Sequence, residues 1–242
     1  MEFAGKIVLV TGASSGIGER IAERFAALGA GVAVNSSKSR EAGTALAERI
    51  GGIYCQADIA DDQAVRSMID KVIDSFGRLD VVVNNAGYTQ VIPHDDLDSV
   101  TDELWERIFN VNVLGAWHVS RAAVPYLRKA DNPCITNVTS IAGIRPIGSS
   151  IPYAVSKAGL NHMTRLLAKA LGPAIRVNAV APGLVDTPWT ADWDEVRAFV
   201  TSNVPMHRPA VPDDVAEACL YLARSNFVTG DLLVVDGGHQ LI

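Results

Sequence analysis

The stretch that decides the fold is IVLVTGASSGIG, which spans residues 7–18. Its first four residues are apolar and predict a strand, while apolar positions recur at helical spacing over residues 17–28. The glycines between them, Gly12, Gly16 and Gly18, predict a tight turn whose backbone can approach a pyrophosphate at the N-terminus of the helix. The spacing is G-x-x-x-G-x-G and differs from the familiar G-x-G-x-x-G fingerprint, so a plain turn between strand and helix remains the alternative.

Short apolar runs alternate with amphipathic helical windows along the rest of the chain. Seven runs are predicted as strands: residues 7–10, 32–35, 53–56, 81–84, 134–138, 177–181 and 232–235. With helices between them, they predict an α/β fold of the Rossmann type, a doubly wound seven-stranded parallel sheet with helices on both faces and the order 3-2-1-4-5-6-7. No linker or repeat divides the sequence, so residues 1–242 are predicted to form a single dinucleotide-binding and catalytic domain.

Composition narrows the class of protein. The chain has 242 residues, of which 48% are hydrophobic and 20% charged, and this is enough for one α/β core. The net charge of −6 argues against a nucleic-acid partner. No apolar stretch approaches about 18 residues and the N-terminus lacks a signal-peptide pattern, so we expect a cytoplasmic protein with no membrane partner. The histidines show no metal-ligand spacing, and no catalytic metal is expected.

A candidate proton-transfer site lies in the second half of the chain. Tyr153 and Lys157 are four residues apart and share one face of a helix, and Ser140 ends an apolar run thirteen residues before Tyr153. Pro152 predicts a helix start, which puts Tyr153 in the first turn. A free phenol has a pKa near ~10 and a nearby ammonium favours the phenolate, so Lys157 is expected to make Tyr153 an acid or base near neutral pH. The Ser140 hydroxyl could hold a carbonyl oxygen beside it.

Three more segments accompany this trio. They are Asn84-Asn85-Ala86-Gly87 after an apolar run, Asn112 within residues 109–115, and the segment PGLVDT at residues 182–187. Together with the glycine turn and the Ser, Tyr and Lys, they make the chain resemble the classical subfamily of the short-chain dehydrogenase/reductase superfamily over essentially its whole length. The resemblance implies an NAD(P)(H)-dependent oxidoreductase that transfers a hydride between nicotinamide and a small ketone or secondary alcohol.

The resemblance also implies a role for each matching residue. Tyr153 would donate or accept the substrate proton, and Ser140 would orient the substrate oxygen. Lys157 would bind the ribose hydroxyls and lower the pKa of Tyr153, and Asn112 would hold a water of the proton relay. Tyr153 and Lys157 are thus also implied in cofactor binding, with Gly12, Ser14, Ser15, Gly16, Ile17, Gly18, Asp58, Ile59, Asn84, Ala86, Gly87, Pro182, Gly183, Val185 and Thr187. Asp58 would meet the adenine amino group. For Asn84 and Asn112, turn formation is the alternative.

The end of the second predicted strand indicates which cofactor binds. Where NAD is used, an acidic side chain about 20 residues after the glycine turn binds the adenosine ribose diol. Here that position is Ser36, followed by Ser37 and Lys38. Hydroxyl groups and a cation suit a 2′-phosphate better than a diol, so NADP(H) is favoured. NAD(H) is the alternative, because Ser15 is not the basic residue that some NADP(H)-dependent relatives carry in the glycine turn.

Residues 184–211 contain no clear strand and are predicted to lie beside the rim of the site. In the resembling family this region covers the substrate, which implies a lid. Trp189 and Trp193 are expected either to line an apolar substrate pocket or to pack the lid's own helix. The resemblance further implies a homotetramer, with the helix that carries Tyr153 and the C-terminal segment at contacts between subunits.

The resemblance leaves the substrate open. Similar proteins include the 3-oxoacyl-carrier-protein reductases, so a reductase of fatty-acid or polyketide type is the alternative function. Relatives that dock an acidic carrier protein use basic residues in two loops where this chain has Asp131 and Pro173. Arg128, Lys129 and Arg176 are nearby, so carrier docking is weakened but stays open. An inert dinucleotide-binding regulator is the least favoured hypothesis, because the Tyr-x-x-x-Lys pair is intact.

Overall fold

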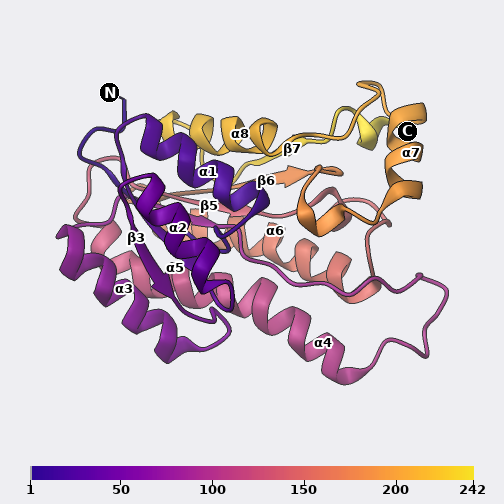
Figure 1. The fold of residues 1–242 in the computed structure, drawn as a ribbon, viewed down its shortest axis with the longest axis horizontal. Coiled ribbons are helices and arrows are strands. Elements are labelled where there is room, and N and C mark those ends of the chain that lie inside the picture. Colours follow the sequence, from indigo (N-terminus) through magenta and orange to yellow (C-terminus); the bar gives the residue numbers. More distant parts are fainter. Residues whose placement is uncertain (1) are drawn as a thin grey trace.

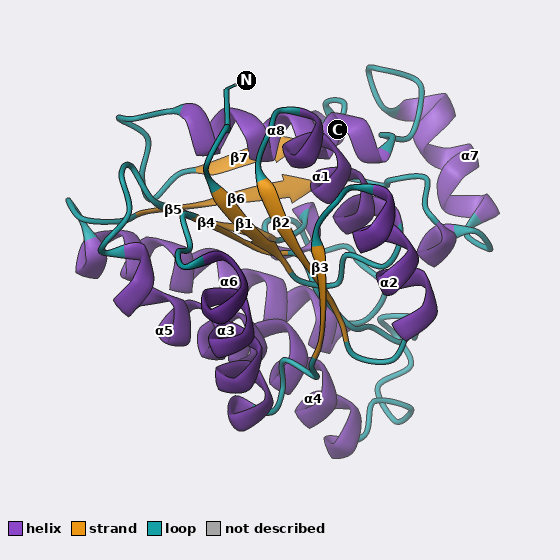
Figure 2. Ribbon diagram, turned by 60° about the vertical axis from the view of Figure 1, so that its left-hand side comes forward, coloured by secondary structure: helices purple, strands orange, loops and turns teal. Residues whose placement is uncertain are grey.

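The computed structural model describes residues 2–242, which build a seven-stranded sheet in which every neighbouring pair of strands is parallel (Figures 1 and 2). The strands are β1 Ile7–Val10, β2 Gly31–Ser36, β3 Ile53–Gln56, β4 Val81–Asn84, β5 Cys134–Val138, β6 Arg176–Pro182 and β7 Leu232–Val235. Their order in the sheet is β3-β2-β1-β4-β5-β6-β7. The predicted Rossmann-type topology is therefore confirmed, with β2 and β6 slightly longer than the sequence indicated.

Helices cover both faces of the sheet, as Figures 1 and 2 show. They are α1 Gly16–Ala27, α2 Arg40–Arg49, α3 Asp62–Phe76, α4 Asp102–Phe109, α5 Ala116–Leu127, α6 Ile151–Leu171, α7 Asp194–Asn203 and α8 Pro212–Arg224. Side chains of α1, α2 and α8 share one buried apolar cluster, and those of α3, α5 and α6 share a second one. The sheet lies between these two clusters.

Strand β1 is apolar throughout because both of its faces are covered, and β4 and β5 are mostly apolar, with Asn84, Thr136 and Asn137 as polar exceptions. In β1, Val8 and Val10 belong to the cluster under α1 and α8, whereas Leu9 between them belongs to the cluster under α3 and α5. Successive side chains of a strand point to opposite faces, so a strand buried on both sides shows no polar alternation. This is why a mostly apolar run predicts each central strand.

Two long segments interrupt the alternation. Residues 85–101 form a loop that ends where Thr101 caps α4 by accepting a hydrogen bond from the Leu104 N–H at 3.3 Å. After β6, residues 183–211 run outward through a 3₁₀ turn, Pro188–Thr190, and α7 before they return. A short parallel bridge between Val185 and Ala210 closes the base of this second excursion. Both segments lie beside the carboxyl edge of the sheet.

The amino edge of the sheet carries a buried ionic cluster around Asp80, whose side chain is 1% exposed. Its carboxylate accepts hydrogen bonds from the Ile7 N–H at 2.9 Å and from both ends of the Arg78 guanidinium at 2.9 and 2.6 Å. Lys6 lies 3.4 Å away. The cluster therefore ties the beginnings of β1 and β4 together.

None of the helices within residues 2–242 is long and apolar enough to cross a lipid bilayer. The same residues contain no group of three or more His, Cys, Asp or Glu side chains placed to bind a metal ion.

Candidate active site

A cavity of about 1770 Å³ opens at the carboxyl edge of the sheet. The carboxyl ends of parallel strands meet at this edge, and it is where α/β proteins of this topology bind ligands. Most of the residues singled out from the sequence line it: Gly12, Ser14, Ser15, Gly16, Ile17, Ser36, Ser37, Lys38, Asp58, Ile59, Ala86, Gly87, Ser140, Tyr153, Lys157, Pro182, Gly183, Val185 and Thr187. Gly18, Asn84 and Asn112 do not line the cavity.

The glycine turn brings backbone to the cavity wall without side chains in the way. Gly12 has a φ of +61°, and a Cβ on it would lie 2.7 Å from the Cα of Ala86. Helix α1 starts at Gly16, and the side chain of its N-cap residue, Ser15, makes no capping hydrogen bond, so the first N–H groups of the helix are left free. Free N–H groups at a helix N-terminus suit a phosphate. This end of the cavity therefore fits the pyrophosphate of a dinucleotide.

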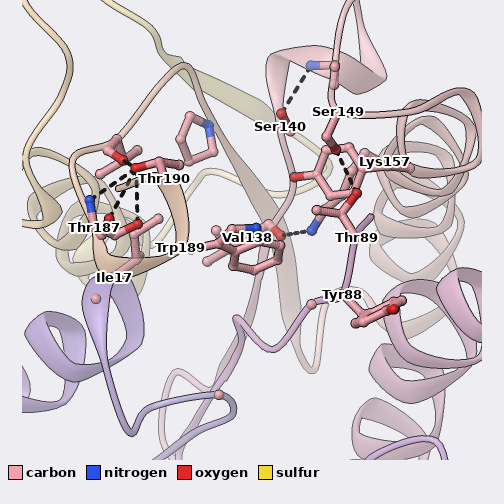
Figure 3. A pocket seen from close by; sticks show the side chains of 18 of the residues that line it. Ile17, Tyr88, Thr89, Val138, Ser140, Ser149, Lys157, Thr187, Trp189 and Thr190 are labelled. Carbon is pink, nitrogen blue, oxygen red and sulfur yellow. Dashed lines mark hydrogen bonds between the residues drawn. The ribbon is translucent and has the colours of Figure 1, made fainter. Parts of the chain in front are cut away.

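Tyr153, Lys157 and Ser140 line the same cavity. Figure 3 shows two of them, Ser140 and Lys157. Helix α6 starts at Ile151 with Pro152 in its first turn, so Tyr153 lies in that turn, as predicted, and Lys157 follows one turn later. The Lys157 amine donates a hydrogen bond to the Val138 carbonyl at 3.0 Å and lies 5.6 Å from the centre of the Tyr153 ring. Ser140 follows β5, and its hydroxyl accepts a hydrogen bond from the Ala142 N–H at 3.1 Å.

Burial shifts the pKa values of Tyr153 and Lys157 in opposite directions. It raises the pKa of Tyr153 to about 12, against the opposite influence of the Ser140 hydroxyl. It lowers the pKa of Lys157 to about 8. Lys157 is not among the causes of the Tyr153 shift, so the lowering of the Tyr153 pKa by Lys157 stays a prediction. Tyr153 is therefore protonated at neutral pH, which is the form that can donate a proton.

The buried lysine should make stability depend on pH. Between pH 8 and the ordinary lysine pKa of 10.5, the unfolded chain keeps a proton that folded Lys157 has lost, so folding becomes more favourable as pH rises. We expect the wild type to gain about 2 kcal/mol of unfolding free energy relative to Lys157→Met between pH 7 and pH 10. Urea unfolding at each pH measures this. Lys169→Met, on the exposed side of α6, is the control, and parallel curves for all three proteins would contradict the prediction.

Asn112 is not among the residues that line the cavity, and its part in a proton relay stays a prediction. Its side chain is 1% exposed and clamps the loop after β4 to α6. The Oδ1 atom accepts a hydrogen bond from the Tyr88 N–H at 2.7 Å, and the Nδ2 atom donates to the Tyr88 carbonyl at 3.0 Å and to Ser156 Oγ at 2.9 Å. Asn112 lies in a π-helical stretch, Asn110–Gly115, that joins α4 to α5 and sets this direction. The side chain has a structural role here.

Asn84 and Gly18 also lie behind the residues that line the cavity. The Asn84 amide donates to Asn137 Oδ1 at 2.9 Å and to Ser120 Oγ at 3.1 Å, so it points into the protein under the sheet. The neighbouring Asn85 lines the cavity instead, and its amide donates to the carbonyls of Thr11 and Gly12 at 3.0 Å each. A Cβ on Gly18 would collide with that amide and with the Gly12 carbonyl. Gly18 thus makes room for Asn85, which secures the glycine turn.

At the far end of the cavity, the residues after β2 are polar. Ser36 is buried and its hydroxyl hydrogen-bonds to that of Tyr54 at 2.9 Å, whereas Ser37 and Lys38 are exposed along the rim. Asp58 lines the same end, and its carboxylate lies 3.6 Å from the guanidinium of Arg107. Hydroxyl groups and a cation therefore surround the position that is acidic in NAD-binding sites of this kind.

The excursion after β6 supplies aromatic walls near the trio. Trp189, Trp193 and Phe199 all line the cavity. The edge of the Trp189 indole lies 3.4 Å from the position of a Cβ on Gly87, which is itself 3.7 Å from the Lys157 amine. Figure 3 shows Trp189 directed at this part of the cavity. Aromatic side chains therefore form part of the cavity wall beyond the trio.

Sequence reasoning missed several lining residues. Asn85 directly follows Asn84, and the sequence alone does not show which of the two lines the cavity. Successive residues of a strand face opposite sides, so only one of them can do so. Arg107 and Arg145 also line the cavity, and no local sequence pattern marks them. They reach it only because α4 and the loop after β5 are folded against the same edge.

Comparison with known protein families gives a match over most of the chain. The family model described as enoyl-(acyl carrier protein) reductase matches residues 12–240. A relative from Streptomyces violaceoruber, assigned as ketoacyl reductase 2 of the granaticin polyketide synthase, is 48% identical over 240 residues, which cover 98% of this chain and 96% of the relative.

Two solved structures have nearly the same fold. One, from Burkholderia xenovorans, is assigned to the short-chain dehydrogenase/reductases; it has a TM-score of 0.91 and 36% identity, and the match covers 98% of each chain. The other is a 3-ketoacyl-(acyl-carrier-protein) reductase from Brucella melitensis in complex with NADH. It has a TM-score of 0.91 and 33% identity, and again 98% of each chain is covered.

Proposed function

The chain belongs to the short-chain dehydrogenase/reductase family, and from this premise we propose that it transfers a hydride between NADP(H) and a small ketone or secondary alcohol, with Tyr153 as acid or base. The family makes it an oxidoreductase of carbonyl and alcohol groups. The observation that carries the proposal is that the glycine turn, Ser140, Tyr153 and Lys157 all line one cavity. A scaffold for binding alone would not need a phenol and an amine on its wall.

Each residue of the trio has a distinct task in this proposal. The nicotinamide cofactor supplies or takes the hydride when it is bound. Tyr153 gives its proton to the carbonyl oxygen during reduction, and a pKa of about 12 keeps that proton on the phenol at neutral pH. The Ser140 hydroxyl holds the substrate oxygen beside the phenol. Lys157, whose amine already meets the Val138 carbonyl, binds ribose hydroxyls with its remaining donors.

The other cofactor contacts follow from the lining residues. The turn Gly12, Ser14, Ser15, Gly16 and Ile17 holds the pyrophosphate, and Asp58 and Ile59 hold the adenine. Ala86 and Gly87 form the wall beside the nicotinamide ribose, with Pro182, Gly183, Val185 and Thr187 against the nicotinamide. Asn84, Gly18 and Asn112 support these positions from behind the wall rather than by contact.

NADP(H) is preferred over NAD(H) in our proposal. Ser37 and Lys38 lie exposed at the rim next to buried Ser36, and no carboxylate occupies the end of β2 in the described chain. A lysine ammonium attracts a 2′-phosphate and has nothing comparable to bind in a ribose diol.

Dissociation constants for NADPH and NADH test this preference. We expect the wild type to bind NADPH at least about tenfold more tightly, which corresponds to about 1.4 kcal/mol. Lys38→Ala should weaken NADPH binding about fivefold, since exposed charge pairs contribute about 1 kcal/mol or less, and should leave NADH binding unchanged. Ligand titration followed by nicotinamide fluorescence measures both constants. A tenfold preference for NADH would reverse the assignment.

A ketoacyl substrate is the second candidate, and the two ketoacyl-reductase relatives favour it. The charged residues near the two expected docking loops do not favour docking of an acidic carrier protein. Arg176, one of the basic residues near the expected docking loops, is 7% exposed, and its guanidinium donates to the carbonyls of Leu222 and Ala223 at 2.7 and 3.0 Å. The exposed basic residues that remain are Arg128 and Lys129, beside the acidic Asp131, and Lys169 in the last turn of α6. We therefore propose that free carbonyl substrates are used better than carrier conjugates.

Specificity constants decide between the two candidates. We expect simple ketones and a short 3-oxoacyl thioester to be reduced at least as well as the matching 3-oxoacyl-carrier protein, with little effect of salt. Nicotinamide absorbance at low and at high ionic strength measures this. An advantage for the carrier conjugate that fades with salt, and that is lost in Arg128→Glu, would instead establish carrier docking, since electrostatic steering is screened by salt.

We also propose that the protein works in the cytoplasm as a homo-oligomer, most simply a tetramer. Leu114 and Trp117 near the start of α5, and Val155 and Leu166 on α6, are exposed apolar side chains that contacts between subunits would bury. The excursion at residues 184–211 serves as the substrate lid.

A further inference from the structure

Arg145 is a cation on the cavity wall to which the proposed reaction gives no task. It lies five residues after Ser140, on the loop that leads from β5 to α6, and it lines the cavity. Its backbone is fixed at both sides: the Arg145 N–H donates to the Ile141 carbonyl at 2.8 Å, and its carbonyl accepts from the Ile147 N–H at 2.8 Å. The guanidinium is therefore attached to a backbone segment that these hydrogen bonds hold in place.

The guanidinium is only partly used within the protein. It donates one hydrogen bond, at 3.3 Å, to the carbonyl of His239, and no carboxylate of residues 2–242 lies within ion-pair distance of it. The other arginine that lines the cavity, Arg107, has Asp58 as its partner. The planar guanidinium has several donors in a fork that matches a carboxylate or phosphate. Most donors of Arg145 are thus left for a ligand.

The surroundings make this cation effective. Arg145 is half-buried, and its hydrogen-bond partner His239 packs on Phe199, with 5.8 Å between the ring centroids, so water around the guanidinium is restricted. His239 is not an anionic partner for Arg145. Burial lowers the pKa of His239, Asp236 acts in the opposite direction, and Arg145 adds to the lowering. A charge-assisted hydrogen bond is stronger in such a partly apolar site than in water.

From this placement we infer that Arg145 binds an anionic group of the substrate, a carboxylate or a phosphate, while the substrate carbonyl lies between Ser140 and Tyr153. The inference rests on the proposed function, which it extends from small ketones in general to ketones that carry an anion. Aromatic walls together with one cation suit a cyclic or aromatic keto acid. The phosphodiester of a pantetheine arm has the same charge and is the other source of such an anion.

Two other tasks for Arg145 are less consistent with its position. The pyrophosphate of the cofactor belongs at the glycine turn, on a different wall formed by β1 and α1. Asp192, Asp194 and Glu195 of the predicted lid also line the cavity, but all three are exposed, and Asp194 already accepts a hydrogen bond from Arg197 at 3.1 Å. If Arg145 served only to hold the lid or the His239 carbonyl, its loss would affect neutral and anionic substrates equally.

Binding of matched ligand pairs tests the inference without turnover. The first pair is 4-oxocyclohexanecarboxylate and its methyl ester, and the second is 3-oxobutyryl-phosphopantetheine and 3-oxobutyryl-pantetheine, which lacks only the phosphate. Calorimetry on the full chain with oxidised cofactor gives each dissociation constant, because a ketone cannot be reduced in that complex. We expect the wild type to bind the anionic member of one pair about 10- to 100-fold more tightly, as charged hydrogen bonds imply. The preferred pair identifies the source of the anion.

The variants complete the test. Arg145→Gln should lose the charge preference and bind the neutral members as the wild type does, whereas Arg145→Lys should keep part of it. Arg66→Gln removes the same charge from the exposed face of α3 and should keep the full preference for the anionic ligand. The inference is overturned if the wild type shows no charge preference in either pair, or if Arg145→Gln retains the preference.

Turnover separates this inference from the proposed function. If the wild type binds the anion through Arg145 but reduces no ketone with either reduced cofactor, the proposed function fails and the inference stands. If neutral and anionic ketones are reduced with equal specificity constants and Arg145→Gln lowers both equally, the inference fails and the proposed function stands.

Discussion

Tyr153→Phe is expected to lower kcat for ketone reduction by about 10³-fold while the dissociation constant of the cofactor changes less than about twofold. The phenol is the only group of the trio placed to give a proton to a substrate oxygen held by Ser140, since the Lys157 amine is engaged with the Val138 carbonyl. Phenylalanine keeps the ring that packs 5.6 Å from that amine. Binding should therefore survive and proton transfer should not.

Steady-state rates from nicotinamide absorbance measure the change, and a fluorescence titration measures cofactor binding. Tyr221→Phe, which removes a hydroxyl from an exposed tyrosine of α8, is the matched control and should keep full activity. The pH dependence gives a second check. Because Tyr153 loses its proton only near pH 12, alcohol oxidation, which needs the phenolate, should keep rising with pH where reduction does not. A Tyr153→Phe enzyme with near wild-type turnover would show that another group carries the proton.

Gly12→Ala is expected to weaken cofactor binding by about 100-fold or more. The new Cβ would lie 2.7 Å from the Cα and 3.0 Å from the N of Ala86, so the turn after β1 and the strand end after β4 must separate. Both neighbours are backbone atoms, which cannot rotate away as a flexible side chain does. The cavity wall that would hold the pyrophosphate is thus distorted, and a loss of this size corresponds to about 3 kcal/mol.

Gly51→Ala separates this clash from backbone strain. Gly51 has a φ of +67°, close to the +61° of Gly12, but a Cβ there meets nothing within 4 Å. Both substitutions should lower the unfolding free energy by about 1 kcal/mol through the left-handed backbone alone. Only Gly12→Ala should also change the dissociation constant of the cofactor. Equal cofactor affinity in the two variants would mean that the glycine turn is not a binding surface.

The parts of the fold that local patterning governs could be predicted from the sequence. Strands buried on both faces are mostly apolar runs, and the glycine turn and Pro152 mark helix starts whatever the rest of the chain does. Right-handed crossovers then leave few sheet orders, of which 3-2-1-4-5-6-7 is that of the Rossmann type. For the same reason Tyr153 and Lys157 could be placed on one helical face before the structure was known.

Side-chain direction at irregular backbone could not be predicted in this way. Asn112 lies in a π-helical stretch, where a residue turns to a face that regular helical spacing does not give. The pKa of Tyr153 depends on how dry its surroundings are, and this is a property of the assembled cavity. Arg145 reaches the cavity through a loop without periodicity. Each of these features is set by tertiary structure and has no local sequence signal.

The ionic cluster around Asp80 has a consequence for how this protein can change over evolution. It holds β1 and β4 together at one edge of the sheet, while every residue that we assign to binding or chemistry lies at the other edge. Substitutions that are well separated and share no partners usually have additive effects. A stabilising change near Asp80 can therefore offset a destabilising one in the loops around the cavity, so new substrates can be explored there while the scaffold stays folded.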